Sequence, residues 1–285
     1  MNFINDLKLQ YKTGGIVQKL IFWNVGIFIL SLVFFYQFTK GYFALPNWLA
    51  LHSNLSVFSQ NPWTLFTYMF LHSGFLHLLF NMIVLNFSGR LFTTYFTGRQ
   101  LFGLFILGGI FSGIVYLLSY FLLGMASQLV GASGAIMAVL IATATYAPNM
   151  SLRLPLIGIV KLWHVAAVIL AIDLIQLPLQ NTGGHIAHLG GAIFGYLYIK
   201  LLQQGTDLAK GISKLQDVVE NWSKPKPKHS FKKVHRNTNP IKNTFSNREK
   251  DIHQKKIDAI LDKISQSGYD SLTKEEKQYL FKAGK

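Results

Sequence analysis

Side chains that could do chemistry stand at three places in otherwise apolar segments of this chain. They are His77 with Asn81, Ser133, and His188 with His185 three residues before it. A polar side chain is costly in a helix that faces lipid, so those inside a helical bundle need a reason. A serine hydroxyl is a poor nucleophile until a base takes its proton, and histidine is the usual base. The residue types therefore predict a serine nucleophile, Ser133, with a histidine as its base.

Ser133 stands in the sequence Gly-Ala-Ser-Gly-Ala, residues 131–135. A nucleophile elbow has the pattern Gly-x-Ser-x-Gly and needs a strand-to-helix turn in an α/β sheet. The flanking sequence here is that of apolar helices and the fifth residue is Ala135, which argues against an α/β-hydrolase. What remains is a serine at the start of a short helix, where free backbone N–H groups suit an oxyanion. A purely structural serine, bonded to a carbonyl one turn back, is the alternative.

His188, like Ser133, lies near one end of its apolar segment, so the two side chains can meet if their helices touch. Small residues at four-residue spacing allow such close approach. They are Gly134, Ala138 and Ala142 on one helix, and Gly191 and Gly195 on the other. We therefore predict His188 as the base and keep His185, on the same helical face, as its competitor. His77 and Asn81 also share a helical face and could both donate hydrogen bonds to an oxyanion, although a polar clamp between helices is the simpler alternative.

The composition predicts a polytopic, all-α membrane protein. Only 14% of the 285 residues are charged, against about 25% in an ordinary soluble domain. No charged side chain occurs between Arg99 and Arg153. The net charge of +15 arises from a basic tail and from short loops beside apolar spans, so we predict no nucleic-acid partner. The chain has no cysteine, and we expect neither a metal site nor a cofactor.

Six apolar segments are candidates to cross a hydrocarbon core of ~30 Å. They cover residues 20–38, 75–92, 101–123, 133–146, 160–177 and 185–202. We therefore expect an N-terminal segment at 1–19, a six-span domain at 20–203, a flexible basic linker at 204–248 and a small helical element at 249–285. Lys and Arg gather in the loops on the side of the termini, which places both termini in the cytoplasm and the catalytic groups toward the outer face.

The C-terminal element is expected to be a helical hairpin. Apolar residues at helical spacing run from Ile252 to Ile264 and end before Gly268. Thr273 and Glu276 match a capping box ahead of a second helix. This element carries no catalytic constellation, so a docking or stabilising role is the simplest interpretation.

Together the motifs resemble those of the rhomboid proteases. His77-Leu-Leu-Phe-Asn81-Met, Gly131-Ala-Ser133-Gly134 and Ala187-His188-Leu-Gly-Gly191 with Gly195 occur in the family's order, on the second, fourth and sixth spans. The resemblance covers roughly residues 15 to 203. The chain departs from common family residues at Thr64, Phe92 and Met137.

This resemblance implies a Ser133–His188 dyad without an acidic third member. The oxyanion would be held by His77, Asn81 and the backbone N–H of Ser133. It implies a bacterial inner-membrane endopeptidase that cuts single-span membrane proteins near the outer part of their transmembrane segment. On this interpretation Asp173 is an interfacial or structural carboxylate. The rival hypotheses are a silent relative that binds such clients without cutting them, and a channel or transporter; the oligomeric state is open.

Overall fold

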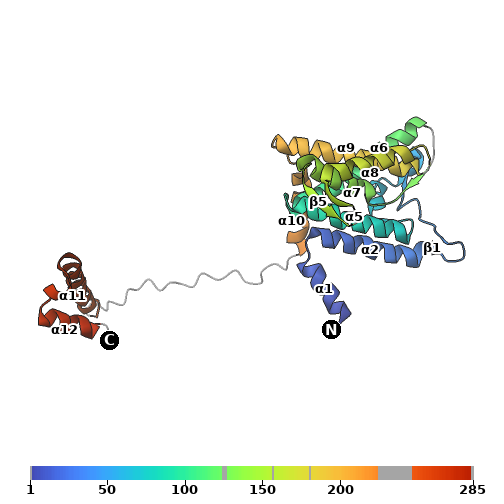
Figure 1. Ribbon diagram of the computed structural model, residues 1–285. Helices are drawn as coiled ribbons and strands as arrows, with labels where there is room; N and C mark the ends of the chain where they lie inside the picture. Colours follow the sequence, from blue (N-terminus) through green and yellow to red (C-terminus); the bar gives the residue numbers. More distant parts are fainter. Residues whose placement is uncertain (1, 124–126, 156, 180, 224–245, 284–285) are drawn as a thin grey trace. The chain divides into compact units, whose positions relative to one another are not determined.

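The computed structural model describes residues 2–123, 127–155, 157–179, 181–223 and 246–283 (Figure 1). The chain divides into two compact units, residues 1–224 and 225–285, and each is described by itself. The first unit opens with a short helix, α1 (Phe3–Thr13), before the bundle begins.

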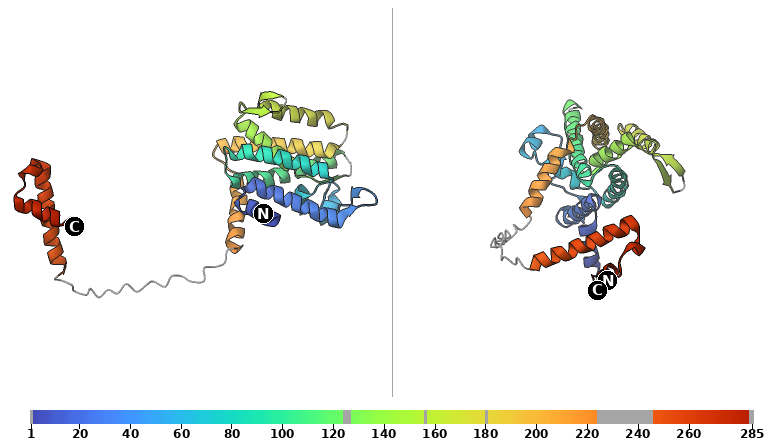
Figure 2. Two further views of the ribbon diagram at one scale, coloured as in Figure 1. Left: turned by 60° about the horizontal axis from the view of Figure 1, so that its bottom comes forward. Right: turned by 90° about the vertical axis from the view of Figure 1, so that its left-hand side faces the viewer.

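Six helices of the first unit correspond to the six predicted spans (Figure 2). They are α2 (Ile16–Phe35), α5 (Phe75–Thr93), α6 (Gly98–Leu123), α7 (Ser133–Tyr146), α8 (Leu162–Gln176) and α9 (Thr182–Gln203). Within the described ranges, three helices (α2, α5 and α6) are long and apolar enough to cross a membrane, and α7 and α8 are shorter apolar helices. The prediction of an all-α, polytopic membrane bundle is confirmed.

Short elements join these helices. They are the helices α3 (Leu55–Gln60), α4 (Thr64–Thr67) and η1 (Tyr68–Phe70), and the antiparallel strand pairs β1 (Tyr36–Gln37) with β2 (Tyr42–Phe43), β3 (Leu51–His52) with β4 (Gln128–Leu129), and β5 (Ser151–Leu154) with β6 (Gly158–Lys161). The last pair corrects the predicted start of the fifth span. Val160 belongs to β6 and pairs with Leu152 of β5, so α8 begins only at Leu162.

Helix α7 lies at the centre of the bundle, and every residue from Gly134 to Ala144 is buried. Glycines let α9 approach it closely. A methyl group at Gly191 would overlap the carbonyl oxygen of Gly134, and one at Gly195 would overlap that of Ala138. The backbones of α7 and α9 are therefore in direct contact, which holds the start of α7 against the first turns of α9.

The structure corrects the predicted linker at residues 204–248. Residues 209–223 form a helix, α10 (Ala209–Ser223), instead of flexible chain. Asp207 accepts a hydrogen bond from the backbone N–H of Ala209 (2.9 Å) and another from the hydroxyl of Tyr198 on α9 (3.1 Å), so it both caps α10 and ties it to the bundle. The remainder of the predicted linker, residues 224–245, lies outside the described residues.

The second unit is a helical hairpin, as the sequence predicts. It consists of α11 (Ser246–Ser267), a 3₁₀ turn, η2 (Tyr269–Ser271), and α12 (Lys274–Ala283). The capping box is present: the N–H of Thr273 donates to Glu276 (2.8 Å), and the N–H of Glu276 donates to the Thr273 hydroxyl (3.2 Å). Lys263 Nζ lies 2.9 Å from Glu276 Oε2 and joins the two helices.

Acidification is expected to weaken this contact between α11 and α12. The hydrogen bond from Lys263 lowers the pKa of Glu276, with further lowering by Thr273. Because the folded pKa lies below the unfolded one, the stabilisation is present above the unfolded pKa and is lost as the pH falls through the folded pKa. NMR of the full-length protein should show the amide signals of Thr273 and Glu276 moving together over that acidic range. Glu276→Gln should abolish this pH dependence and Glu275→Gln should keep it, whereas an unchanged titration in Glu276→Gln would contradict the account.

Candidate active site

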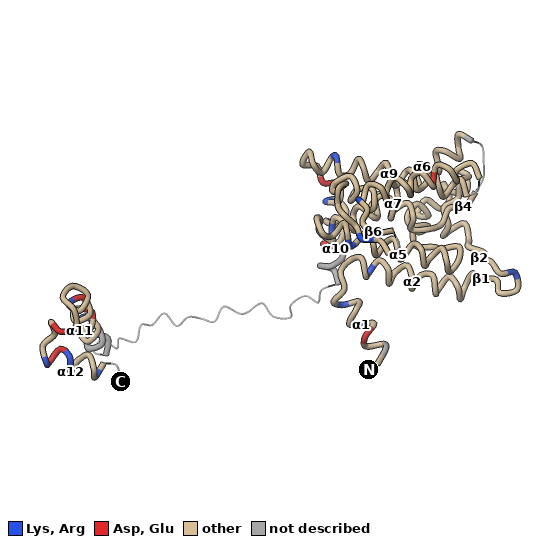
Figure 3. The backbone as a smooth tube through the Cα atoms, in the orientation of Figure 1, with Lys and Arg blue, Asp and Glu red and all other residues tan. Residues whose placement is uncertain are grey.

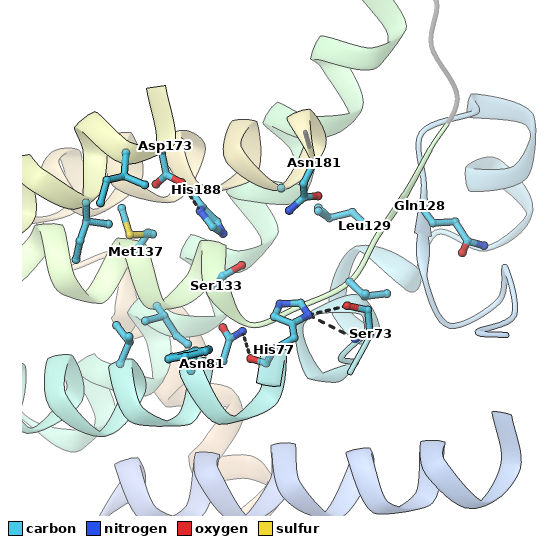
Figure 4. A pocket seen from close by; sticks show the side chains of 17 residues that line it. Ser73, His77, Asn81, Gln128, Leu129, Ser133, Met137, Asp173, Asn181 and His188 are labelled. Carbon is cyan, nitrogen blue, oxygen red and sulfur yellow. Dashed lines mark hydrogen bonds and ion pairs between the residues drawn. The ribbon is translucent and has the colours of Figure 1, made fainter. Parts of the chain in front are cut away.

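One cavity of about 650 Å³ gathers the residues singled out in the sequence (Figure 4). Helices α5, α7, α8 and α9 and strand β4 all contribute to its wall. Its polar lining comprises Ser73, His77, Asn81, Gln128, Ser133, Asp173, Asn181 and His188. His185, the competitor for the role of base, does not line this cavity and is buried.

Ser133 is the first residue of α7. Gly131, two residues before it, has φ +131°, a conformation that side chains other than glycine rarely adopt. The N–H of Gly131 donates to the carbonyl of Tyr68 (2.9 Å), which fixes the approach to the helix. The N–H groups of a helix's first turn have no partner within the helix and face what lies beyond its end. The start of α7 can therefore stabilise negative charge beside the Ser133 hydroxyl.

His77 and Ser133 both lie close to Gly131. A methyl group placed on Gly131 would lie 2.9 Å from His77 Nε2 and 3.6 Å from Ser133 Oγ. Gly131→Ala is therefore expected to strain the backbone and to push against the His77 ring. Backbone strain of about 1–3 kcal/mol predicts a loss of roughly 5- to 150-fold in the rate at which a fluorophosphonate labels Ser133. The control is Gly211→Ala, because a methyl there meets nothing within 4 Å. Wild-type labelling of Gly131→Ala would show that this approach is unimportant.

His77, on the first turn of α5, is held by Ser73. The backbone N–H of Ser73 points at His77 Nδ1 (3.4 Å), and the Ser73 hydroxyl lies 3.0 Å from the same atom (Figure 4). An Nδ1 that accepts a backbone N–H leaves the ring proton of a neutral histidine on Nε2. Nε2 is also the atom close to Gly131. His77 is thus arranged as a hydrogen-bond donor at the start of α7.

Asn81 lies one turn further along α5, and its side-chain amide donates to the carbonyl of His77 (2.8 Å). The amide NH₂ has two N–H groups, so one is left for a second acceptor, and Asn81 lines the cavity. His72, which precedes α5, is buried in the turn behind His77, with 5.1 Å between ring centroids. Burial lowers the pKa of His72 to about 3, so its ring is neutral and packs without adding charge.

The structure differs from the sequence interpretation at Asp173. This carboxylate is 4% exposed, and its Oδ1 lies 2.7 Å from His185 Nδ1 and 2.8 Å from His188 Nδ1. Asp173 sits on the face of α8 that is turned toward α9, and the two histidines are one turn apart on α9. When His188 Nδ1–H donates to Asp173, the lone pair of Nε2 is free to accept a proton. Figure 4 shows His188 between Asp173 and Ser133.

Within the described part of the chain, Ser133 Oγ and the His188 ring line the same cavity but are not hydrogen-bonded to each other. Such contacts are often long without substrate and shorten when one binds. The predicted nucleophile and base therefore line the same cavity, and a hydrogen bond between them would form only when substrate binds.

The cluster of Asp173, His185 and His188 also has the residue types of a metal site, since one ligand atom from each lies within 4.8 Å of the others. Two atoms bound to one tetrahedral zinc at ~2.0 Å would be about 3.3 Å apart. The two nitrogens lie only 2.7 and 2.8 Å from the same carboxylate oxygen, which is hydrogen-bonding distance. The arrangement of these residues is that of two imidazole N–H donors on one carboxylate.

Comparisons with known proteins show which family this helical bundle belongs to. The family model described as "Rhomboid domain" matches residues 59–205, more than half of the chain and all of α5 to α9. The chain belongs to the rhomboid family. A second model, a family of unknown function (DUF6576), matches residues 243–282, a range that includes α11 and nearly all of α12.

Two relatives of this rhomboid illustrate the match. Presenilin-associated rhomboid-like protein A, mitochondrial, of Danio rerio is 34% identical over 135 residues, which is 46% of this chain and 35% of that protein. Rhomboid protease GlpG of Yersinia pestis (strain Pestoides F) is 28% identical over 191 residues, 66% of this chain and 63% of that protein. The matches thus span about a third and just under two thirds of these relatives.

The three departures from common family residues are each accommodated locally in this rhomboid. Thr64 is buried, and its hydroxyl donates to the carbonyl of Asn61 (2.6 Å). Phe92 is fully buried and packs on Phe96, with 4.6 Å between ring centroids. Met137 lines the cavity one turn after Ser133. Phe92 and Phe96 thus make an apolar contact inside the bundle.

Proposed function

We propose that this rhomboid is an intramembrane serine endopeptidase that cleaves single-span membrane proteins. The observation that carries the proposal is the convergence of Ser133, His188 and His77 with Asn81, from three separate helices, on one cavity. Each residue has a partner or position suited to one role: a nucleophile at a helix start, a base whose Nδ1 is occupied, and a donor whose Nδ1 is occupied by Ser73.

In the acylation step, His188 Nε2 takes the proton of Ser133 as Oγ attacks the carbonyl carbon of the scissile peptide bond. The carbonyl oxygen becomes an oxyanion that accepts hydrogen bonds from the Ser133 N–H, His77 Nε2–H and Asn81 Nδ2–H. His188 then gives its proton to the departing amine, so the C–N bond breaks and an ester to Ser133 remains. In the second step His188 takes a proton from water as the water oxygen attacks the ester carbonyl carbon. His188 then returns that proton to Ser133 Oγ as the ester C–O bond breaks, which releases the acid and free Ser133.

The setting of the cavity supports this substrate class. It opens within a helical membrane protein, so a peptide bond that reaches it comes from another membrane-embedded segment. A carbonyl inside a helix already accepts a hydrogen bond, so the substrate must be locally unwound to be attacked. We therefore expect cleavage near helix-destabilising residues of a single transmembrane segment.

The proposed orientation has both termini in the cytoplasm of a bacterium and the site toward the outer face of the inner membrane. Basic side chains of the first unit gather chiefly at the end of the bundle that carries α10, whereas β4 lies toward the opposite end (Figure 3). Gln128 and Leu129 of β4 line the cavity. Since Lys and Arg accumulate on the cytoplasmic side, this distribution supports an outward-facing site.

The test is a cleavage assay in liposomes that contain the full-length protein and a single-span reporter with helix-destabilising residues in one half of its membrane segment. The proposal predicts two fragments, and mass spectrometry should place the cut in that half. A reporter that lacks those residues serves as the control and should be cut more slowly. An intact reporter that co-purifies with the wild-type protein would instead support a client-binding relative without protease activity.

A further inference from the structure

The carboxylate of Asp173 is an unusual group in this bundle. Asp6 and Asp173 are the two acidic residues in the first 203 positions, and Asp6 belongs to α1, outside the bundle. A buried carboxylate inside a membrane domain is costly unless it is paired. Asp173 is paired twice through one oxygen, with His185 and with His188, and both contacts are shorter than 3 Å.

We infer that Asp173 is a positioning residue for the base His188, and that the base is complete only while α8 is docked on α9. The inference rests on the proposed serine-protease function. It adds an acidic member to the pair that the family resemblance implies, and it gives His185 a role as well.

The chemical role of Asp173 follows from the atoms it contacts. A carboxylate at Nδ1 holds the proton there, keeps Nε2 as the acceptor, and fixes the ring so that Nε2 faces the nucleophile. It also stabilises the positive charge that appears on His188 when the base takes the Ser133 proton. No proton needs to move to Asp173 in this scheme.

His185 differs from His188 in exposure although both bind the same oxygen. The His185 side chain is 9% exposed and lies outside the cavity wall, whereas the His188 side chain is 21% exposed and forms part of that wall. His185 therefore anchors Asp173 from the buried side, and His188 alone meets the reacting atoms.

Because Asp173 lies on α8 and the two histidines lie on α9, their contact also helps to hold these helices together. Of the 15 residues in α8, only Leu162, Ala166 and Asp173 are buried. From residue 167 to the end of the helix, Asp173 is the one buried residue, while Ile172, Leu174 and Ile175 are exposed. Half-buried Ile169 and Leu170 in this half of α8 pack on a cluster that includes Ala192 of α9, and Asp173 adds its one fully buried contact, with the two histidines. Undocking of that half from α9 would therefore take the carboxylate away from the base.

The test compares Asp173→Asn with wild type and with Ile175→Ala, a control on the exposed side of α8. We measure fluorophosphonate labelling of Ser133 against pH, together with kcat and KM for a single-span reporter. Asparagine keeps the size of the side chain but loses its charge. We expect kcat to fall roughly 10²- to 10⁴-fold with little change in KM, and the acidic midpoint of the labelling curve to move down by about one pH unit or more. The charged or ionisable groups that face His188 are Asp173 on α8, His185 on α9 and His77 on α5, so His185→Asn is run in parallel.

Hydrogen exchange of residues 170–177 reports the docking of α8. Exchange there should quicken in Asp173→Asn and stay at the wild-type rate in Ile175→Ala. Wild-type kcat in Asp173→Asn, or a uniform loss at every pH with an unmoved midpoint, would overturn the positioning role, and unchanged exchange would overturn the coupling to α8. Loss of wild-type labelling on addition of EDTA would overturn it in favour of a metal site. A wild-type protein that labels nowhere would instead contradict the proposed function itself.

Discussion

Ser133→Ala is expected to abolish cleavage of a single-span reporter, with a fall in kcat of at least about 10⁴-fold. The substitution removes the oxygen that forms the acyl intermediate, and among the described residues of the cavity wall no other hydroxyl stands at a helix start beside His188. Ser73, the other serine there, is occupied with His77 Nδ1. Reporter cleavage in liposomes, followed over hours, measures the residual rate.

The fold should survive this substitution. Ser133 opens α7, whereas the packing of α7 depends on the buried run from Gly134 to Ala144. The free energy of unfolding should therefore change by less than about 1 kcal/mol. A matched control is Ser119→Ala on α6, whose hydroxyl donates to a carbonyl of its own helix and lies outside the cavity. Full cleavage by Ser133→Ala would remove this serine from the mechanism.

His188→Ala is expected to lower kcat by roughly 10³- to 10⁴-fold, because Ser133 then has no base. His185→Ala should be milder, on the order of 10-fold, because it loosens Asp173 without removing the base. The difference arises from placement: both rings bind Asp173 through Nδ1, but only His188 lines the cavity. Labelling rates of the two variants at one pH provide the comparison.

The two histidine variants also decide the alternative that the sequence left open. If His185→Ala loses activity and His188→Ala retains it, the roles are reversed and the base lies on the buried side of α9. Thermal unfolding of both variants serves as the control, since a variant that unfolds early would lose activity for another reason. Equal and complete loss with unchanged stability would mean that the two rings act as a unit through Asp173.

Much of the bundle could be predicted from sequence because the two ends of a long apolar segment can be read from the sequence itself. The fourth span was expected at residues 133–146, and α7 covers Ser133 to Tyr146. The capping box at Thr273 and Glu276 could likewise be predicted, because its two partners are three residues apart. The same holds for the glycines of α9, because close helix contact needs small residues at a regular spacing.

The contacts of Asp173 could not be predicted because they depend on how α8 is turned. Asp173 is 12 and 15 residues from the two histidines, across a loop, and only the packing of α8 on α9 decides which way its carboxylate points. The sequence does offer one indication: Asp173 is the one acidic residue in its apolar span, and a lone carboxylate there needs a partner. Helix α10 was missed for a similar reason: its polar composition suggested a linker, whereas Asp207 caps the helix and ties it to the bundle.

Mass spectrometry of the fluorophosphonate adduct identifies the nucleophile of this protein. The purified full-length protein is treated with the probe, digested and sequenced, with His188→Ala treated in parallel. We expect a single phosphonylated residue, Ser133, in the wild-type protein, and labelling at least about 10²-fold slower when His188 is absent. An adduct on another residue, or equal labelling of Ser133 with and without His188, would contradict this expectation.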